Sequence, residues 1–172
     1  MIDNGVGNRW GSVEGFVKHE FEPPDAERNG EWDMEYLLIV FLEKLRRRVV
    51  LNYGMGSTVI IHKNGGFAYQ GHSFKSLHYK GRAVDFHINT VSCGTLHPVK
   101  QASLIYDLTN EDFGIGIYTW GCHLDFRFGC DDRTDAVWFQ DAEGNYNYQR
   151  YKDFHRTVVD AMLQPNFKQL PT

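Results

Sequence analysis

The stretch Ser76-Leu77-His78-Tyr79-Lys80-Gly81-Arg82-Ala83-Val84-Asp85-Phe86 decides the expected fold and chemistry of this chain. His78 comes just before a glycine turn at Gly81, and Asp85 lies in a segment, 82–88, that alternates as a half-buried strand does. One face of that strand carries Ala83, Asp85 and His87, and the other carries Val84, Phe86 and Ile88. A catalytic zinc site needs three nitrogen or oxygen ligands and an open fourth position. His78 and Asp85 are candidates for two of them.

A second strand is expected at residues 122–128, Cys122-His123-Leu124-Asp125-Phe126-Arg127-Phe128. Its polar face carries His123, Asp125 and Arg127. If the two polar faces lie together, His78, Asp85 and His123 form a metal site with a residual charge of +1. Asp125 is then close enough to act as a base or to orient a ligand. The alternative is that each polar face points at solvent, as in any one-sided antiparallel sheet.

The remaining periodicities predict an α+β domain with a small antiparallel sheet and flanking helices. A helix is expected over 33–50 with Asp33 as its N-cap and a basic run, residues 44–48, near its C-terminus. Pro98 fits the first turn of a helix over 98–108. Further strands are expected at 57–62, 113–118, 122–128 and 136–140, the last three as an antiparallel meander, followed by a closing helix at 153–163.

Composition limits the classes of partner and compartment. The chain has 172 residues, 42% of them hydrophobic, and one domain over 1–172 is expected. A net charge of −4 disfavours nucleic acid as a partner. The longest apolar stretch, residues 36–42, is far short of the roughly 20 residues that span a membrane, and no signal-peptide pattern is seen. We therefore expect synthesis in the cytoplasm. A monomer is also expected. Cys93, Cys122 and Cys130 are expected to be free, buried thiols.

The motif SxHxxGxAxDF, followed by GxGxY and HxD, resembles the zinc D-Ala-D-Ala peptidases of the hedgehog/D,D-peptidase superfamily, in particular a phage-endolysin-like branch that ends in HxD. The resemblance covers about residues 16–140 and leaves a C-terminal hairpin and helix, 141–164, outside it. It implies a hedgehog/D,D-peptidase-like fold in which His78, Asp85 and His123 hold Zn²⁺.

The chain departs from that family in two places. Many members carry a catalytic carboxylate three residues before the last histidine, where this chain has Trp120. Asp125 is therefore the candidate catalytic acid or base, with Glu111 and Asp112 as weaker options. Residues 62–67 also lack the arginine that the family often has after its central strand, which leaves substrate anchoring open. The candidate substrate-binding residues are Ser76, Arg82, Tyr118 and Trp120.

The expected function is therefore a zinc metallopeptidase that cuts a peptide bond in peptidoglycan, as a D,D-carboxypeptidase or an endopeptidase, acting on the cell wall after release or export. One alternative is a non-catalytic zinc-containing binding or structural module of the same fold. A cysteine hydrolase is disfavoured, because Cys122 is expected on the face of its strand opposite His123. His87 is a possible substitute ligand, and His62 and His72 are possible cleft residues.

Overall fold

The computed structural model describes residues 15–16, 18–21, 34–63, 65–67, 75–128 and 136–169. The expected N-cap Asp33, the loop histidine His72 and Cys130 lie outside these ranges. Along the described chain the elements are η2 (Lys18–Phe21), α2 (Tyr36–Tyr53), β1 (Thr58–Ile61), η3 (His78–Lys80), β2 (Ala83–Thr90), β3 (Gly94–Thr95), α3 (Pro98–Tyr106), β4 (Phe113–Tyr118), β5 (Gly121–Phe126), β6 (Val137–Gln140), β7 (Tyr146–Gln149), η4 (Tyr151–Asp153), α4 (Phe154–Leu163) and α5 (Pro165–Lys168).

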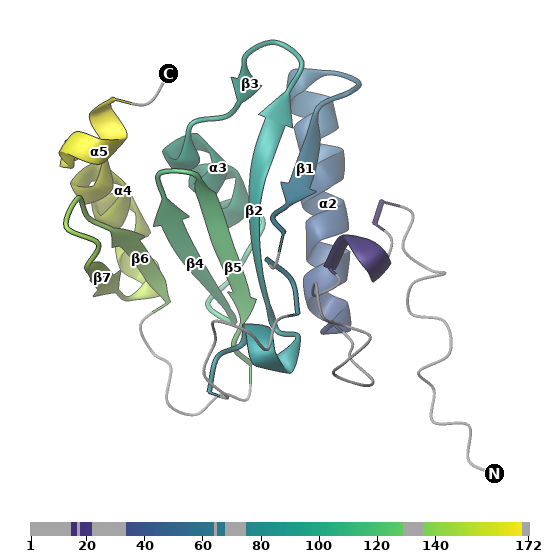
Figure 1. Cartoon of the computed structure of the whole chain (residues 1–172), viewed down its shortest axis with the longest axis horizontal. Helices are drawn as coiled ribbons and strands as arrows, with labels where there is room; N and C mark the ends of the chain where they lie inside the picture. Colours follow the sequence, from purple (N-terminus) through teal and green to yellow (C-terminus); the bar gives the residue numbers. More distant parts are fainter. Residues whose placement is uncertain are drawn as a thin grey trace.

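The strands of the described residues form one seven-stranded sheet in the order β1-β2-β5-β4-β6-β7, with the short β3 paired to β2 (Figure 1). All neighbouring pairs are antiparallel except β4 and β6, which are parallel. The expected antiparallel meander is therefore wrong at its last strand. After β5 the chain returns to the other side of β4, where Ile115 donates its backbone N–H to Ala136 at 2.7 Å. A hairpin is formed by β6 and β7, and it begins at Val137, earlier than the expected bounds of 141–164.

Helices α2, α3 and α4 pack against one face of the sheet, which gives the α+β class expected from the sequence (Figure 1). The apolar side chains of β2, which are Val84, Phe86 and Ile88, point into that layer, while Asp85 and His87 lie on the opposite face. The core therefore lies between the sheet and the helices. The polar face of β2 and β5 is left for the site.

Helix α2 differs from its expected bounds. It begins at Tyr36 and continues to Tyr53, where the chain leaves the helix at Gly54 with φ +89°. The basic run at 44–48 is thus in the middle of the helix and not near its C-terminus, as was expected. The helix over 98–108 is found as α3, with Pro98 in its first turn, and ends at Tyr106.

Candidate metal centre

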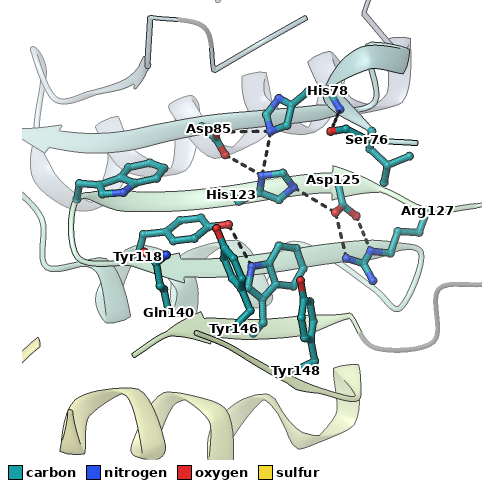
Figure 2. Close-up of a pocket in the computed structure, with 13 residues that line it drawn as sticks. Ser76, His78, Asp85, Tyr118, His123, Asp125, Arg127, Gln140, Tyr146 and Tyr148 are labelled. Carbon is teal, nitrogen blue, oxygen red and sulfur yellow. Dashed lines mark hydrogen bonds and ion pairs between the residues drawn. The ribbon is translucent and has the colours of Figure 1, made fainter. Parts of the chain in front are cut away.

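Three side chains converge on the open face of the sheet. Asp85 and His123 are directly opposite each other on β2 and β5, and His78 reaches the same point from η3 (Figure 2). His123 Nδ1 lies 2.7 Å from Asp85 Oδ1 and 3.2 Å from His78 Nε2. His78 Nε2 lies 3.5 Å from Asp85 Oδ2. The structure thus brings together the three residues that the sequence analysis predicted as metal ligands.

The position of His78 follows from the turn that precedes β2. Gly81 takes the left-handed conformation (φ +65°), which closes the 3₁₀ turn by donating its N–H to the His78 carbonyl at 3.0 Å. The Ser76 hydroxyl accepts the backbone N–H of His78 at 3.3 Å. The ring nitrogen Nδ1 is 2.9 Å from the Gly66 carbonyl, an oxygen that can only accept. His78 therefore carries its proton on Nδ1 and presents the Nε2 lone pair to the site.

His123 is held from its other edge by a buried ion pair. Its Nε2 lies 3.2 Å from Asp125 Oδ2, on the side of the ring away from Asp85 (Figure 2). Arg127 donates from Nε to Asp125 Oδ1 at 2.5 Å and from Nη2 to Asp125 Oδ2 at 3.0 Å. With only 2% of Asp125 exposed, the carboxylate is a fixed acceptor for His123 Nε2–H. This arrangement points Nδ1 of His123 toward Asp85 and His78.

The charges of the group favour a cation. Burial opposes ionisation of Asp85, but the neighbouring His123 and His78 hold its pKa well below the ordinary range. Burial likewise opposes protonation of His123, but the charge of Asp85 and the hydrogen bond to Asp125 raise its pKa to about 9. Hydrogen bonds from His123 and Arg127 lower the pKa of Asp125 to about 2 against the effect of burial. Without a metal, a proton on His123 supplies the positive charge between the two carboxylates.

This donor set fits a metal ion. One nitrogen from each of His78 and His123 and one oxygen from Asp85 all lie within 4.8 Å of one another. Two imidazoles and one carboxylate, with further positions open to a cavity, are the ligands of catalytic zinc sites. The hydrogen bonds to Gly66 and Asp125 are the outer contacts that orient histidine ligands.

Two glycines of β4 make room for the side chains around the group. Gly116 lies between His123 on β5 and Trp138 on β6, and a Cβ at Gly116 would be 2.7 Å from the indole of Trp138. A Cβ at Gly114 would overlap the side chains of Asp125 and Arg127. Because Gly114 and Gly116 have no side chains, the side chains of Asp125, Arg127 and Trp138 can lie directly over the backbone of β4.

The group lies in a cavity of about 500 Å³. Its walls come from η3 and the loop before it, from β2 and from β4 to β7. The lining residues are Ser76, Leu77, His78, Asp85, Tyr118, Trp120, His123, Asp125, Arg127, Trp138, Gln140, Tyr146 and Tyr148. Trp138 Nε1 donates to the Tyr118 hydroxyl at 3.1 Å, and burial raises the pKa of Tyr118 far above its ordinary value. Tyr118 is therefore a neutral hydroxyl that can donate its own proton to a ligand.

Of the four candidate substrate-binding residues, three line this cavity and Arg82 does not. Arg82 donates from Nη2 to the Phe128 carbonyl at 2.6 Å, and its guanidinium lies 5.2 Å from the ring centre of Phe126. Sequence reasoning did not assign Gln140, Tyr146 and Tyr148 to the site. The alternation Tyr-Asn-Tyr-Gln over 146–149, which places both tyrosines on one face of a strand, was the available signal.

Within the described ranges, the other histidines and the thiols lie outside the three-residue group. His87 Nδ1 is 2.9 Å from His62 Nε2, and the His62 ring lies 4.7 Å from that of Trp120, so these two histidines form a separate pair. Cys122 is fully buried on the helix side of β5, where burial raises its pKa, which is consistent with its expected separation from His123. Cys93 is exposed, so the expectation of a buried thiol there is wrong.

No protein-family model, curated protein or solved structure matches this chain. Among the described residues, no helix has the length and apolar character required to cross a bilayer. The interpretation of the site therefore depends on its own geometry and on the motifs in the sequence.

Proposed function

We propose that this protein is a zinc-dependent metallopeptidase with a hedgehog/D,D-peptidase-like fold, which hydrolyses a peptide bond in bacterial cell-wall peptides. The observation that carries the proposal is the convergence of His78 Nε2, Asp85 and His123 Nδ1 in an open cavity of about 500 Å³. The resemblance of the SxHxxGxAxDF and HxD motifs to zinc D-Ala-D-Ala peptidases supports the substrate class.

His78, Asp85 and His123 hold the ion in this proposal, and the ion supplies the Lewis acidity that activates water and polarises a carbonyl near neutral pH. Asp125 and Arg127 keep the His123 ring in one orientation. Of the two roles open to Asp125 from sequence, its contacts support the orienting one, since both of its oxygens are occupied on the edge of His123 away from Asp85.

Tyr118 donates a hydrogen bond from its hydroxyl to the substrate carbonyl in this proposal. Its oxygen already accepts from Trp138, which fixes the phenol in position, and its raised pKa keeps it protonated. The stacked rings of Tyr118 and Trp120, 4.7 Å apart and 6° from parallel, form one wall against which an extended peptide can lie. Trp120 thus shapes the wall at the position where many similar peptidases carry a carboxylate.

A second candidate is a metal-binding module without turnover. The carboxylates that line the cavity are Asp85 and Asp125, and both are held by neighbouring cationic or imidazole groups. The weaker candidates for a base, Glu111 and Asp112, are not among the lining residues. This lack of an uncommitted carboxylate in the described lining favours the module.

The deciding experiment loads the metal-free protein with Zn²⁺ and measures both bound metal and the release of amines from purified peptidoglycan. We expect one zinc per chain and amine release, with both lost in His123→Ala. The matched control is His155→Ala, which removes an exposed histidine of α4 and keeps both properties. Stoichiometric zinc without amine release would favour the module, and a His123→Ala protein that retains a full equivalent would refute the metal centre.

A further inference from the structure

A row of aromatic rings continues outward from the candidate metal centre along β4, β6 and β7 (Figure 2). In this row the ring of Trp120 stacks on that of Tyr118. The ring centre of Tyr118 lies 6.3 Å from that of Tyr146. The rings of Tyr146 and Tyr148 are 6.2 Å apart, and Tyr148 lies 5.7 Å from Trp138. Trp138 in turn lies 5.2 Å from His123. The rings therefore form a continuous wall that begins beside the metal ligands.

The outer part of this wall, Tyr146 and Tyr148, is exposed to water. Tyr146 is 50% exposed and Tyr148 is 52% exposed, although both are large aromatic side chains on a short edge strand. Their alternation along β7 places both rings on the cavity side of the sheet. Clustered, exposed aromatic rings at the mouth of a cavity are a feature of binding surfaces. Strand β7, which carries these two rings, also lies outside residues 16–140, where the chain resembles known peptidases.

Among the described lining residues, those around these two rings are uncharged. The ionised groups of the described lining lie deeper in the site, where Asp125 pairs with Arg127 and Asp85 pairs with His123. The more exposed lining offers phenol hydroxyls, the Ser76 hydroxyl and the Gln140 amide. Together with the net charge of −4, this composition disfavours a phosphorylated ligand and suits a neutral one. A ring that has an apolar face for stacking and hydroxyl or amide groups at its rim is complementary to such a wall.

We propose that Tyr146 and Tyr148 form a stacking subsite for a neutral saccharide chain at the mouth of the cavity. The inference rests on the proposed function in one respect, because it places the sugar beside the peptide that the metal centre cleaves. Binding of the sugar itself requires only the β6–β7 hairpin. It therefore stays measurable in a chain that holds no metal.

The test measures binding of an N-acetylglucosamine tetrasaccharide by calorimetry and tryptophan fluorescence, using full-length, metal-free protein. We expect binding to weaken by about threefold to tenfold in each of Tyr146→Ala and Tyr148→Ala, from loss of one stacking ring. Tyr148→Phe keeps the ring and retains binding. The matched control is Tyr36→Ala, which removes an exposed tyrosine from α2. If an alanine variant does not fold, Tyr148→Leu retains an apolar side chain on the strand without the ring.

The inference is overturned if the wild type does not bind the tetrasaccharide at millimolar concentration, or if both alanine variants bind it as the wild type does. The same measurement on His123→Ala separates the two proposals. Saccharide binding by His123→Ala, together with absent hydrolysis in the zinc-loaded wild type, would refute the peptidase and leave the subsite standing. Hydrolysis by the zinc-loaded wild type without saccharide binding would refute the subsite and support the peptidase.

Discussion

Asp125→Asn is the substitution that best separates an orienting carboxylate from one that transfers protons. Asn keeps the size of the side chain and one acceptor oxygen, but removes the charge that faces His123 Nε2 at 3.2 Å and the Arg127 guanidinium. Because Asp125 and Arg127 are both buried, the variant leaves a guanidinium without its anion. We expect a loss of about 3 kcal/mol in the free energy of unfolding of the metal-free protein, from breaking one buried ion pair.

The effect on metal binding is the more specific measurement. Removal of an outer contact to a histidine ligand typically weakens metal affinity by about 10- to 100-fold. We therefore expect zinc affinity, measured by competition with a chromogenic chelator, to fall by that factor in Asp125→Asn. At saturating zinc the variant should recover most of the turnover of the wild type, since the occupied site has the same ligands.

Asp112→Asn is the control for this experiment. Its carboxylate accepts from the Asn110 side chain at 3.0 Å and does not line the cavity, so both zinc affinity and turnover should be unchanged. The opposite pattern for Asp125→Asn, with zinc affinity intact and turnover at saturating zinc reduced by about a hundredfold or more, would refute the orienting role and identify Asp125 as the acid or base.

Three further expectations follow from the structure. Gly116→Ala should lower the free energy of unfolding by about 1–3 kcal/mol by overpacking the indole opposite it, whereas Gly15→Ala, whose Cβ would meet neighbours at ordinary distances, should be nearly neutral in chemical denaturation. A thiol reagent should label Cys93 and spare Cys122 in the folded protein, as read by mass spectrometry, and leave turnover unchanged. The folded-state pKa of Asp125 is depressed to about 2, so the ionised carboxylate stabilises the folded protein above about pH 4 and this stabilisation is lost as pH falls. The difference in free energy of unfolding between the wild type and Asp125→Asn should therefore shrink by about 2 kcal/mol between about pH 5 and pH 2.

The features of the site that depend on local sequence could be predicted. Alternation over 82–88 placed Asp85 opposite the core, and the glycine at 81 marked the turn that holds His78. The same alternation placed His123 and Asp125 together on one face of β5. The alternation of polar and apolar residues does not show the register in which two strands pair. That Asp85 faces His123, and Ala83 faces Asp125, depends on pairing between strands far apart in the chain.

The errors have the same non-local origin. The sequence around Trp138 reads as a strand, but nothing within it shows that β6 pairs in parallel with β4 rather than antiparallel with β5. For this reason Tyr146 and Tyr148, which reach the cavity only through β6, were not recognised as site residues. Likewise, Arg82 precedes the ligand strand in sequence, yet its contact with Phe128 takes it out of the cavity.

The order β1-β2-β5-β4-β6-β7 has a kinetic consequence for the candidate metal centre. His123 follows Asp85 by 38 residues and His78 by 45, and all three ligand atoms meet only after β5 has inserted between β2 and β4. An ion that needs all three ligands binds after that long-range pairing has formed, and therefore late in folding. Such an ion lowers the unfolding rate and leaves the folding rate nearly unchanged. Chelation should thus shorten the lifetime of the folded chain more than it delays refolding.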